Sequence, residues 1–168
     1  KNAADITSDS RYVGGIAGKT TGAIQNCYNV GTIASPYDRK RGLVGGIAGD
    51  SSNNIENCYN TGKLDVGELE KCGAIVGWHN GETINNCYYL DSSYEKGGNV
   101  YKSDTADEMK SPDFAALLGT AFMYKEGDYP ALSWETPTVS VRFDIEPASA
   151  VLSINGAAYT GNCNVALP

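Results

Sequence analysis

The first 90 residues contain short apolar segments that recur in a fixed order, separated by Gly, Asn, Ser and Asp. The block Val-Gly-Gly-Ile-Ala-Gly at 13–18 recurs at 44–49, and a third version occupies 72–77. Each block is followed by an isoleucine and, three positions later, by a cysteine within an Asn-Cys-Tyr triplet. Short apolar segments bounded by turn-forming residues are typical of strands. The pattern therefore predicts similar units, each with three short apolar segments that form strands.

A unit of about 30 residues cannot bury its own apolar face, so it must stack on its neighbours. Residues 2–6 repeat the pattern of residues 29–33, which predicts a partial copy before the complete ones. The copies are expected at about 1–12, 13–43, 44–71 and 72–90. Stacking places equivalent residues above one another at the ~4.8 Å strand spacing. We therefore expect a mainly β chain with a parallel β-solenoid over 1–90, in which loops such as 36–42 absorb differences in length.

Equivalent residues of the three triplets should form columns along this stack. The columns are Asn26, Asn57 and Asn86; Cys27, Cys58 and Cys87; and Tyr28, Tyr59 and Tyr88. Amides can bond along a stack, aromatic rings can stack face to face, and a small thiol suits a narrow interior. Strict alternation would place Cys27 opposite Ile24 and Tyr28, whereas a bend at Asn26 would turn Cys27 inward. We favour the bend, because the residue before each Asn varies as outward positions do.

The glycine blocks and the following Ile-x-Asn-Cys-Tyr-Asn-x-Gly-x-Ile pattern resemble the GLUG motif, over about residues 1–90. That repeat occurs in bacterial surface proteins, among them filamentous-haemagglutinin-like adhesins and IgA-cleaving metallopeptidases, as an accessory region. The third copy departs from it at Cys72, Ala74 and Tyr89, as a terminal rung would. The resemblance implies a non-catalytic region of a surface or secreted protein, and no catalytic residue follows from it.

Two helix starts follow the repeats: Thr105 with Glu108 as a capping box, and Ser111 with Pro112. The second helix would have an apolar face and end at a glycine, at Phe114, Leu117, Leu118 and Gly119. Residues 129–134 are expected to form an extended closing segment. Because the last rung of a solenoid needs cover, we expect 91–136 to form a C-terminal cap.

Residues 137–168 have a different pattern. Val139, Val141, Phe143 and Ile145 alternate with polar residues, which predicts a half-buried strand. The segment 147–156 predicts a strand that enters a tight turn, and its Pro-x-x-Ala-x-x-x-Ile-x-Gly pattern resembles the start of PEGA-like surface modules. The chain stops early for a complete sandwich, so we expect a partial β-sandwich-like tail and a piece of a longer protein.

Composition excludes several kinds of chemistry. A formal net charge of −7 argues against nucleic-acid binding, and no apolar run approaches the ~18 residues of a membrane span. Five cysteines cannot all pair within one chain. They also lack the Cys-x-x-Cys pairs of structural zinc sites, since Cys58 and Cys72 are the nearest in sequence. We expect buried free thiols, with one disulfide between rungs as the alternative.

Other candidate groups also have structural explanations. His79, the only histidine, lies within Trp78-His79-Asn80-Gly81, which we expect to be a surface turn. The acids of the repeats are dispersed, which predicts solvated charge rather than a glycosidase or lyase site: Asp50, Glu56, Asp65, Glu68 and Glu70. Calcium is the only cofactor considered, at Asp104, Asp107 and Glu108, but acids at a helix start need no ion.

These observations predict a non-catalytic structural or interaction module of a bacterial cell-surface or secreted protein, with an adhesive or spacer role. Its partner would be a host surface protein or a glycan, and we expect a monomer. The alternative is an accessory domain of a secreted hydrolase or peptidase, for example one that binds carbohydrate. Trp78 and His79 are the candidate ligand surface, because we expect the tyrosine column to be buried.

Overall fold

A computed structural model describes residues 1–36, 42–66, 71–80, 83–93 and 102–135, together with 140–143, 151–154, 157–160 and 163–166. The chain divides into two compact units, Lys1–Ser133 and Trp134–Pro168. Most of the predicted loop 36–42 lies outside the described residues, as do Val139 and Ile145.

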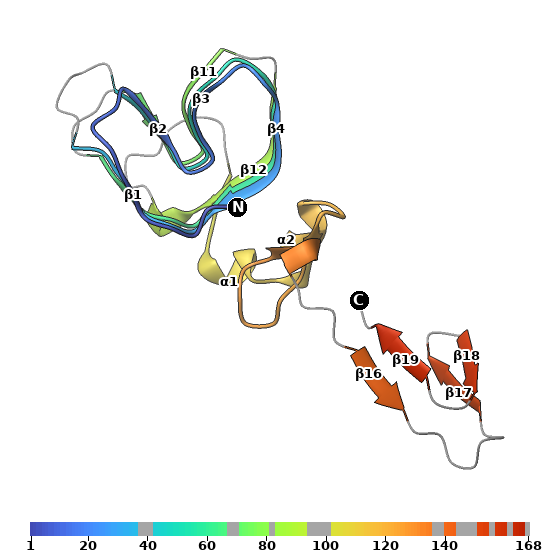
Figure 1. The fold of residues 1–168 in the computed structure, drawn as a ribbon. Helices are drawn as coiled ribbons and strands as arrows, with labels where there is room; N and C mark the ends of the chain where they lie inside the picture. The colour runs from blue at the N-terminus through green and yellow to red at the C-terminus, as the bar shows by residue number, and fades with distance from the viewer. Residues whose placement is uncertain are drawn as a thin grey trace. The chain divides into compact units, whose positions relative to one another are not determined.

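The first unit is a solenoid of short parallel strands stacked in four columns (Figure 1). Three columns hold three strands each: β1 (Ile6–Thr7), β5 (Ile33–Ala34) and β9 (Leu64–Asp65); β2 (Tyr12–Gly14), β6 (Leu43–Gly45) and β10 (Lys71–Gly73); and β3 (Ala17–Thr20), β7 (Ala48–Ser51) and β11 (Val76–His79). The fourth holds β4 (Ile24–Asn29), β8 (Ile55–Asn60), β12 (Ile84–Leu90) and β13 (Lys102–Asp104). The predicted parallel solenoid is confirmed, but each turn uses four strands instead of three, because each glycine block divides into two strands, such as β2 and β3, instead of forming one.

The register of the stack is the one that the alignment of copies predicts. Val13 pairs with Val44, which pairs with Cys72. The partial first copy takes its expected place, because Ile6 pairs with Ile33 and Asn2 bridges to Asn29. Side chains that share an alignment position therefore lie in one column, and the interior consists of repeated residues.

The glycine block lets the coil fold inward between β2 and β3, which run side by side in Figure 1. The last glycine of each block (Gly18, Gly49 and Gly77) lies on the face where these strands meet. A Cβ on Gly49 would lie 2.7 Å from the carbonyl oxygen of Leu43 and 2.7 Å from the backbone nitrogen of Val13. Real Cβ atoms do not approach backbone so closely, so only glycine permits this contact.

The last repeat departs from the pattern for a structural reason. In the first copy, a Cβ on Gly15 would lie 2.7 Å from the side-chain oxygen of Asn29, so the glycine and the buried amide need each other. The third copy has Ala74 and Tyr89 at these two positions. Tyr89 pairs with Asn60 in register and packs against both apolar clusters of the interior. Its ring thus fills the end of the interior and ends the amide ladder at Asn60.

The cap begins with two short helices, α1 (Ala106–Met109) and α2 (Pro112–Leu117), after a 3₁₀ turn at Asp91–Ser93. The predicted capping box forms, because the Thr105 hydroxyl accepts from the Glu108 N–H while the Glu108 carboxylate accepts from the Thr105 N–H. The helices are followed by β14 (Phe122–Met123), β15 (Ala131–Leu132) and a 3₁₀ turn at Ser133–Glu135. Segment 129–134 is therefore extended only in part.

The second helix starts and stops as predicted, but its apolar face differs. The Ser111 hydroxyl accepts from the Phe114 N–H, and Gly119 has a φ of 88° just after the helix. Phe114 and Leu118 are buried, whereas Leu117 is 54% exposed. The prediction for Leu117 was wrong, because the cap contacts the solenoid along the i, i+4 line that joins Phe114 to Leu118.

Most of the described residues of the cap lie beside the rungs, and not over the last rung as expected. Its apolar side chains pack against the outer face of β4, β8 and β12, on the column of tyrosines, and α1 and α2 lie outside the coil in Figure 1. The residues that take part are Met109, Phe114, Leu118, Phe122 and Leu132. Among the described residues that follow β12, β13 extends the edge of the last rung by pairing with β12. A row of aromatic rings offers more apolar area than a strand edge, which accounts for this placement.

The second unit contains two antiparallel strand pairs. β16 (Ser140–Phe143) pairs with β19 (Cys163–Ala166), and β17 (Val151–Ile154) pairs with β18 (Ala157–Thr160). β16 and β17 lie within the two segments predicted to form strands, whereas the predicted turn at 155–156 lies outside the described residues. In the described part of the whole chain, no helix has the length and apolar character needed to cross a membrane.

Candidate functional site

The triplet Asn-Cys-Tyr bends at its asparagine in all three copies. Asn26, Asn57 and Asn86 have φ angles of 53°, 51° and 47°, and no other non-glycine residue in the described part of the chain has a positive φ. Asparagine tolerates this left-handed conformation better than most residues. The bend places Ile24 and Cys27 in the same interior cluster and leaves Tyr28 on the outer face. This is the geometry that we predicted from the sequence.

Replacement of Asn57 should separate the effect of this bend from that of the side chain. Asn57→Gly and Asn57→Ala both remove the amide, but only alanine opposes a positive φ. We expect the free energy of unfolding of the alanine variant to be about 1–2 kcal/mol lower than that of the glycine variant. Urea denaturation of the two proteins gives this difference directly. Equal stability of the two variants would show that the bend carries no strain.

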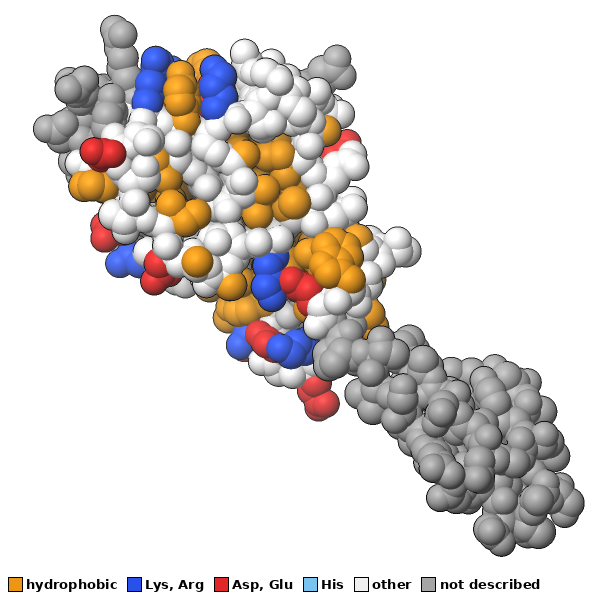
Figure 2. Space-filling model, viewed as in Figure 1, with side chains coloured by type: hydrophobic (Ala, Val, Ile, Leu, Met, Phe, Trp, Pro, Cys, Tyr) orange, Lys and Arg blue, Asp and Glu red, His pale blue; other side chains and the backbone are white. Residues whose placement is uncertain are grey.

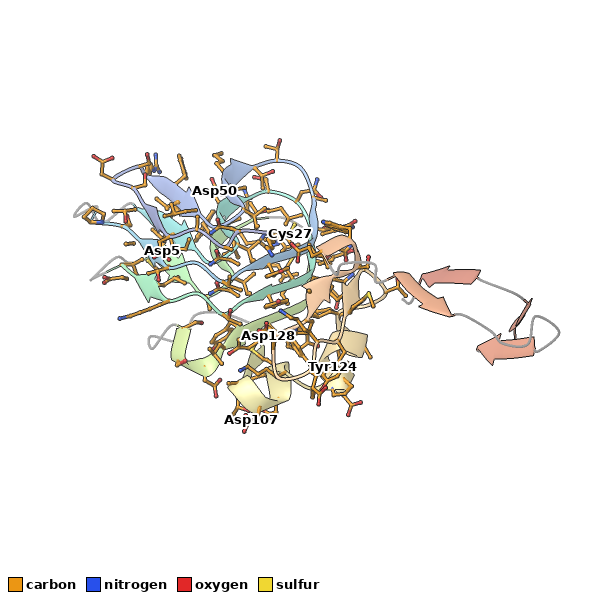
Figure 3. The ribbon with its side chains drawn as sticks, turned by 60° about the horizontal axis from the view of Figure 1, so that its bottom comes forward. Asp5, Cys27, Asp50, Asp107, Tyr124 and Asp128 are labelled. Carbon is orange, nitrogen blue, oxygen red and sulfur yellow. The ribbon has the colours of Figure 1, made fainter. Side chains whose placement is uncertain are left out.

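The cysteine column points into the solenoid. Cys58 and Cys87 are 0% and 5% exposed, while Cys27, at the first rung, is half-buried and is labelled in Figure 3. Each thiol donates to the carbonyl of the residue two positions earlier, at 3.2 Å for Cys27, 3.1 Å for Cys58 and 3.3 Å for Cys87. These three and Cys72 are free thiols. The column therefore fills space in the core.

The thiols of this column differ in acidity. Hydrogen bonding from the Cys58 thiol lowers the pKa of Cys27 to about 7, against an opposing effect of burial. Side-chain hydrogen bonding with Cys27 and with Cys87, together with burial, raises the pKa of Cys58. Only the deprotonated thiol is a nucleophile. Cys27 is thus the reactive member of the column.

Alkylation should reveal this order. At neutral pH, iodoacetamide should modify Cys27 before Cys58, Cys72 and Cys87, with a rate that rises through pH 7 as the thiolate forms. A Cys58→Ala variant lacks the hydrogen bond that favours the Cys27 thiolate. The pH at which the alkylation rate of Cys27 reaches half of its maximum should therefore rise towards the ordinary thiol pKa of about 8.5. Peptide mapping by mass spectrometry against pH checks both results. A midpoint unchanged in the variant would contradict the assigned cause.

A second amide ladder, which the sequence analysis did not single out, crosses the interior. The Asn2 side chain donates to Asn29 at 2.7 Å, and the Asn29 side chain donates to Asn60 at 2.8 Å. Asn29 and Asn60 are both 0% exposed and also donate to the carbonyls of Gly31 and Gly62. The alignment of Asn2 with Asn29 was the signal that pointed to this ladder. The predicted ladder at Asn26, Asn57 and Asn86 forms too, with longer contacts of 3.4 and 3.2 Å.

The tyrosine column lies under the cap. The rings of Tyr28 and Tyr59 stack at 4.8 Å between centroids with 8° between their planes, and Phe114 meets Tyr88 edge-on at 5.1 Å. All three tyrosines are at most 5% exposed, and the Tyr59 hydroxyl donates to the carbonyl of Pro130. A ligand therefore cannot stack on this column while the cap is in place.

Trp78 and His79 lie in strand β11 instead of the predicted surface turn. Trp78 is 45% exposed. His79 is partly buried, and both of its ring nitrogens are buried without a hydrogen-bond partner in the structure. Among the residues that the structure describes, none forms a hydrogen bond with the ring of His79. Of the two candidate ligand residues, only Trp78 is exposed enough to contact a ligand.

Trp78 belongs to a charged aromatic surface, which we call the β2–β3 rim. It comprises Arg11, Tyr12, Lys19, Asp50, Lys71 and Trp78, from the strands on either side of the inward fold. Lys19 forms an ion pair with Asp50 at 2.9 Å. Asp50 is only 6% exposed, so the prediction of a solvated acid was wrong for this residue. Its carboxylate is buried because it lies on the middle rung, between the first and third.

Of the three acids predicted as calcium candidates, Glu108 belongs to the capping box of α1. The Glu108 carboxylate accepts from the hydroxyl and the N–H of Thr105, and this hydrogen bonding lowers its pKa. Asp107 lies in the first turn of α1 and is exposed, at the opposite side of the view in Figure 3 from Asp50. The part of the chain that the structure describes holds no group of three His, Cys, Asp or Glu side chains suited to a metal ion.

The structure thus brings together copies of the same residue, and the comparisons with known proteins agree with a repeat. A model of the GLUG motif matches residues 9–34. This stretch includes the first glycine block and the first Asn-Cys-Tyr triplet. The register of the strands carries the same residues into the second and third rungs. Neither the curated proteins nor the solved structures include a match to this chain.

Proposed function

We propose that residues 1–133 serve as a stiff, non-catalytic structural module that holds or spaces other parts of a bacterial surface or secreted protein. The observation that carries this proposal is the continuity of the interior. The Asn2–Asn29–Asn60 ladder, the thiol column and the stacked tyrosines each run across successive rungs. The cap adds a second layer of apolar packing along the same rungs. A module cross-braced in this way resists bending and stretching, as a spacer or an adhesin stalk must.

Several finer parts of the proposal rest on resemblance. The GLUG motif at 9–34 supports a place on the cell surface or outside the cell, as in the adhesins and peptidases that carry this repeat. The pattern at 147–156 supports a PEGA-like module in the second unit, and two antiparallel strand pairs are compatible with the start of a sandwich. In this proposal the chain acts as a monomer and meets a host protein or a glycan through its outer surface.

Force spectroscopy on the whole chain tests the structural role. Held between its two ends, the protein should keep its length until residues 1–133 unfold in one abrupt step, because the ladders couple all rungs. A single increase in length that corresponds to the unfolding of residues 1–133, separate from the unfolding of the second unit, would support a stiff spacer. Gradual extension at low force, rung by rung, would contradict it.

A second candidate function is that of an accessory carbohydrate-binding domain. One observation favours it: Trp78 is 45% exposed, whereas the other residues of β11 are buried or partly buried. Exposed aromatic rings are common contact surfaces for sugars. Binding to sugars on a broad glycan array would support this candidate if a Trp78→Ala variant no longer bound. Absence of binding on such arrays would count against it.

A further inference from the structure

The β2–β3 rim concentrates positive charge on an acidic chain. Arg11, Lys19 and Lys71 are exposed, and the rim's one acid, Asp50, is buried and paired with Lys19. The rim therefore has an excess of positive charge among its described side chains, although the whole chain carries −7. Figure 2 shows basic side chains on both sides of a hydrophobic one at the edge of the solenoid. Such a local excess favours an anionic partner at this place.

Aromatic rings hold the cations of the rim in position. The Lys19 ammonium and the Arg11 guanidinium lie 5.0 and 5.1 Å from the ring centroid of Tyr12. On the third rung the Lys71 ammonium lies 3.8 Å from the ring centroid of Trp78. Cation–π contact limits the motion of these long side chains, which lowers the entropy lost when they bind an anion.

The spacing along the rim suits an extended polymer. Lys19 and Trp78 occupy one row of the β3–β7–β11 sheet, with Asp50 between them. Two rung spacings separate the first rung from the third, about 10 Å in all. Sugar rings in an extended polysaccharide follow one another at a distance of the same order as the spacing between rungs. A short oligosaccharide would therefore reach Lys19 on the first rung and Lys71 and Trp78 on the third.

We propose that the β2–β3 rim binds an acidic polysaccharide, with Lys19, Lys71 and Arg11 contacting carboxylates and Trp78 contacting a sugar ring. The polymer would run along the solenoid axis, across the rungs. This inference deepens the accessory carbohydrate-binding candidate, and it is independent of the structural role. It assigns the class of glycan and the residues that select it.

Polygalacturonate and its methyl ester provide a matched pair of probes, since esterification removes the negative charge and keeps the backbone. A Trp134→Phe background leaves Trp78 as the only tryptophan, because the chain has two. We expect polygalacturonate to change the Trp78 fluorescence at low ionic strength, and added salt to weaken the effect. The ester should bind at least about tenfold more weakly.

Charge variants complete the test by affinity electrophoresis on the full chain. Lys19→Gln and Lys71→Gln should each weaken binding of polygalacturonate several-fold, and the double variant about tenfold or more. Lys63→Gln is the matched control, because Lys63 is exposed and lies outside the rim. Circular dichroism confirms that each variant is folded.

Three results would overturn this inference. Equal binding of the ester, lost in Trp78→Ala, would leave a carbohydrate-binding module but remove its selectivity for acidic polymers. Equal binding of single-stranded DNA would show a general response to polyanions. Absence of binding to both probes would overturn the inference and leave the structural role untouched, since that role is measured by force.

Discussion

Cys58→Asp should unfold the solenoid at neutral pH. Cys58 is 0% exposed and lies in the middle of the thiol column, between Cys27 and Cys87. An aspartate there would place a carboxylate in an apolar interior that offers no cation. The cost of several kcal/mol is comparable with the roughly 5–15 kcal/mol that stabilises a typical domain. Circular dichroism at pH 7 should therefore report loss of the β signal.

The pH dependence of this variant distinguishes charge from shape. Burial raises the pKa of a carboxyl, so the folded-state pKa of the new aspartate would exceed its unfolded value of about 3.9. Below the unfolded value both states are protonated and the penalty for charge is absent. It grows as the pH rises towards the folded-state pKa and is complete above it. Relative to the original chain, the variant should thus be least impaired near pH 3–4.

The same substitution one rung away is the matched control. Cys27 occupies the equivalent position on the first rung but is half-buried, so water can reach a carboxylate at this position. Cys27→Asp should remain folded at pH 7 with a modest loss of stability. If Cys58→Asp and Cys27→Asp melt at similar temperatures, the column faces water and the inward bend at Asn57 is wrong.

Asn60→Leu should cause the second large loss. The Asn60 amide accepts from Asn29 at 2.8 Å, accepts from the Gly62 N–H at 3.2 Å and donates to the Gly62 carbonyl at 2.9 Å. Leucine has a similar branched shape but can make none of these bonds. The backbone groups of Gly62 and one N–H of Asn29 would lose buried partners, at about 1–3 kcal/mol each. We expect urea denaturation to show a total loss of about 3–5 kcal/mol.

Asn2→Leu tests whether burial causes this loss. Asn2 is the outer member of the same ladder, half-buried, with bonds to Asn29 at 2.7 Å and to the Ala4 carbonyl at 2.8 Å. Water can reach the exposed Ala4 carbonyl, and the Asn29 oxygen loses one bond, so this substitution should cost about 1–2 kcal/mol, less than Asn60→Leu. Losses of equal size at both positions would argue against a special role for the buried part of the ladder.

The repeated positions made the fold accessible from sequence. The spacing between Val13, Val44 and Cys72 gave the register of the stack, and the tolerance of asparagine for positive φ gave the inward turn of the cysteines. Both follow from local geometry, because in a solenoid a residue's neighbours are its own equivalents. The partial copy at the start was predictable for the same reason.

Positions that do not repeat were harder to predict. The cap consists of sequence found once, so nothing in the chain indicated that Phe114 and Leu118 would pack on the tyrosine column. Asp50 looked solvated because its equivalents are Lys19 and Trp78, and only the structure places it on the middle rung beside a cation. The rim, likewise, joins unlike residues from different copies, which an alignment of equivalent positions hides.

Equivalent residues of successive rungs stack on one another in this fold, and NMR can measure this stacking directly. Nuclear Overhauser effects should connect Ile24 with Ile55 and the ring of Tyr28 with the ring of Tyr59, whose centroids lie 4.8 Å apart. These pairs are distant in sequence, so only a stacked register brings them together. Cross-peaks at both pairs are the predicted result. Resolved signals for all four residues without these cross-peaks would contradict the solenoid and every proposal built on its columns.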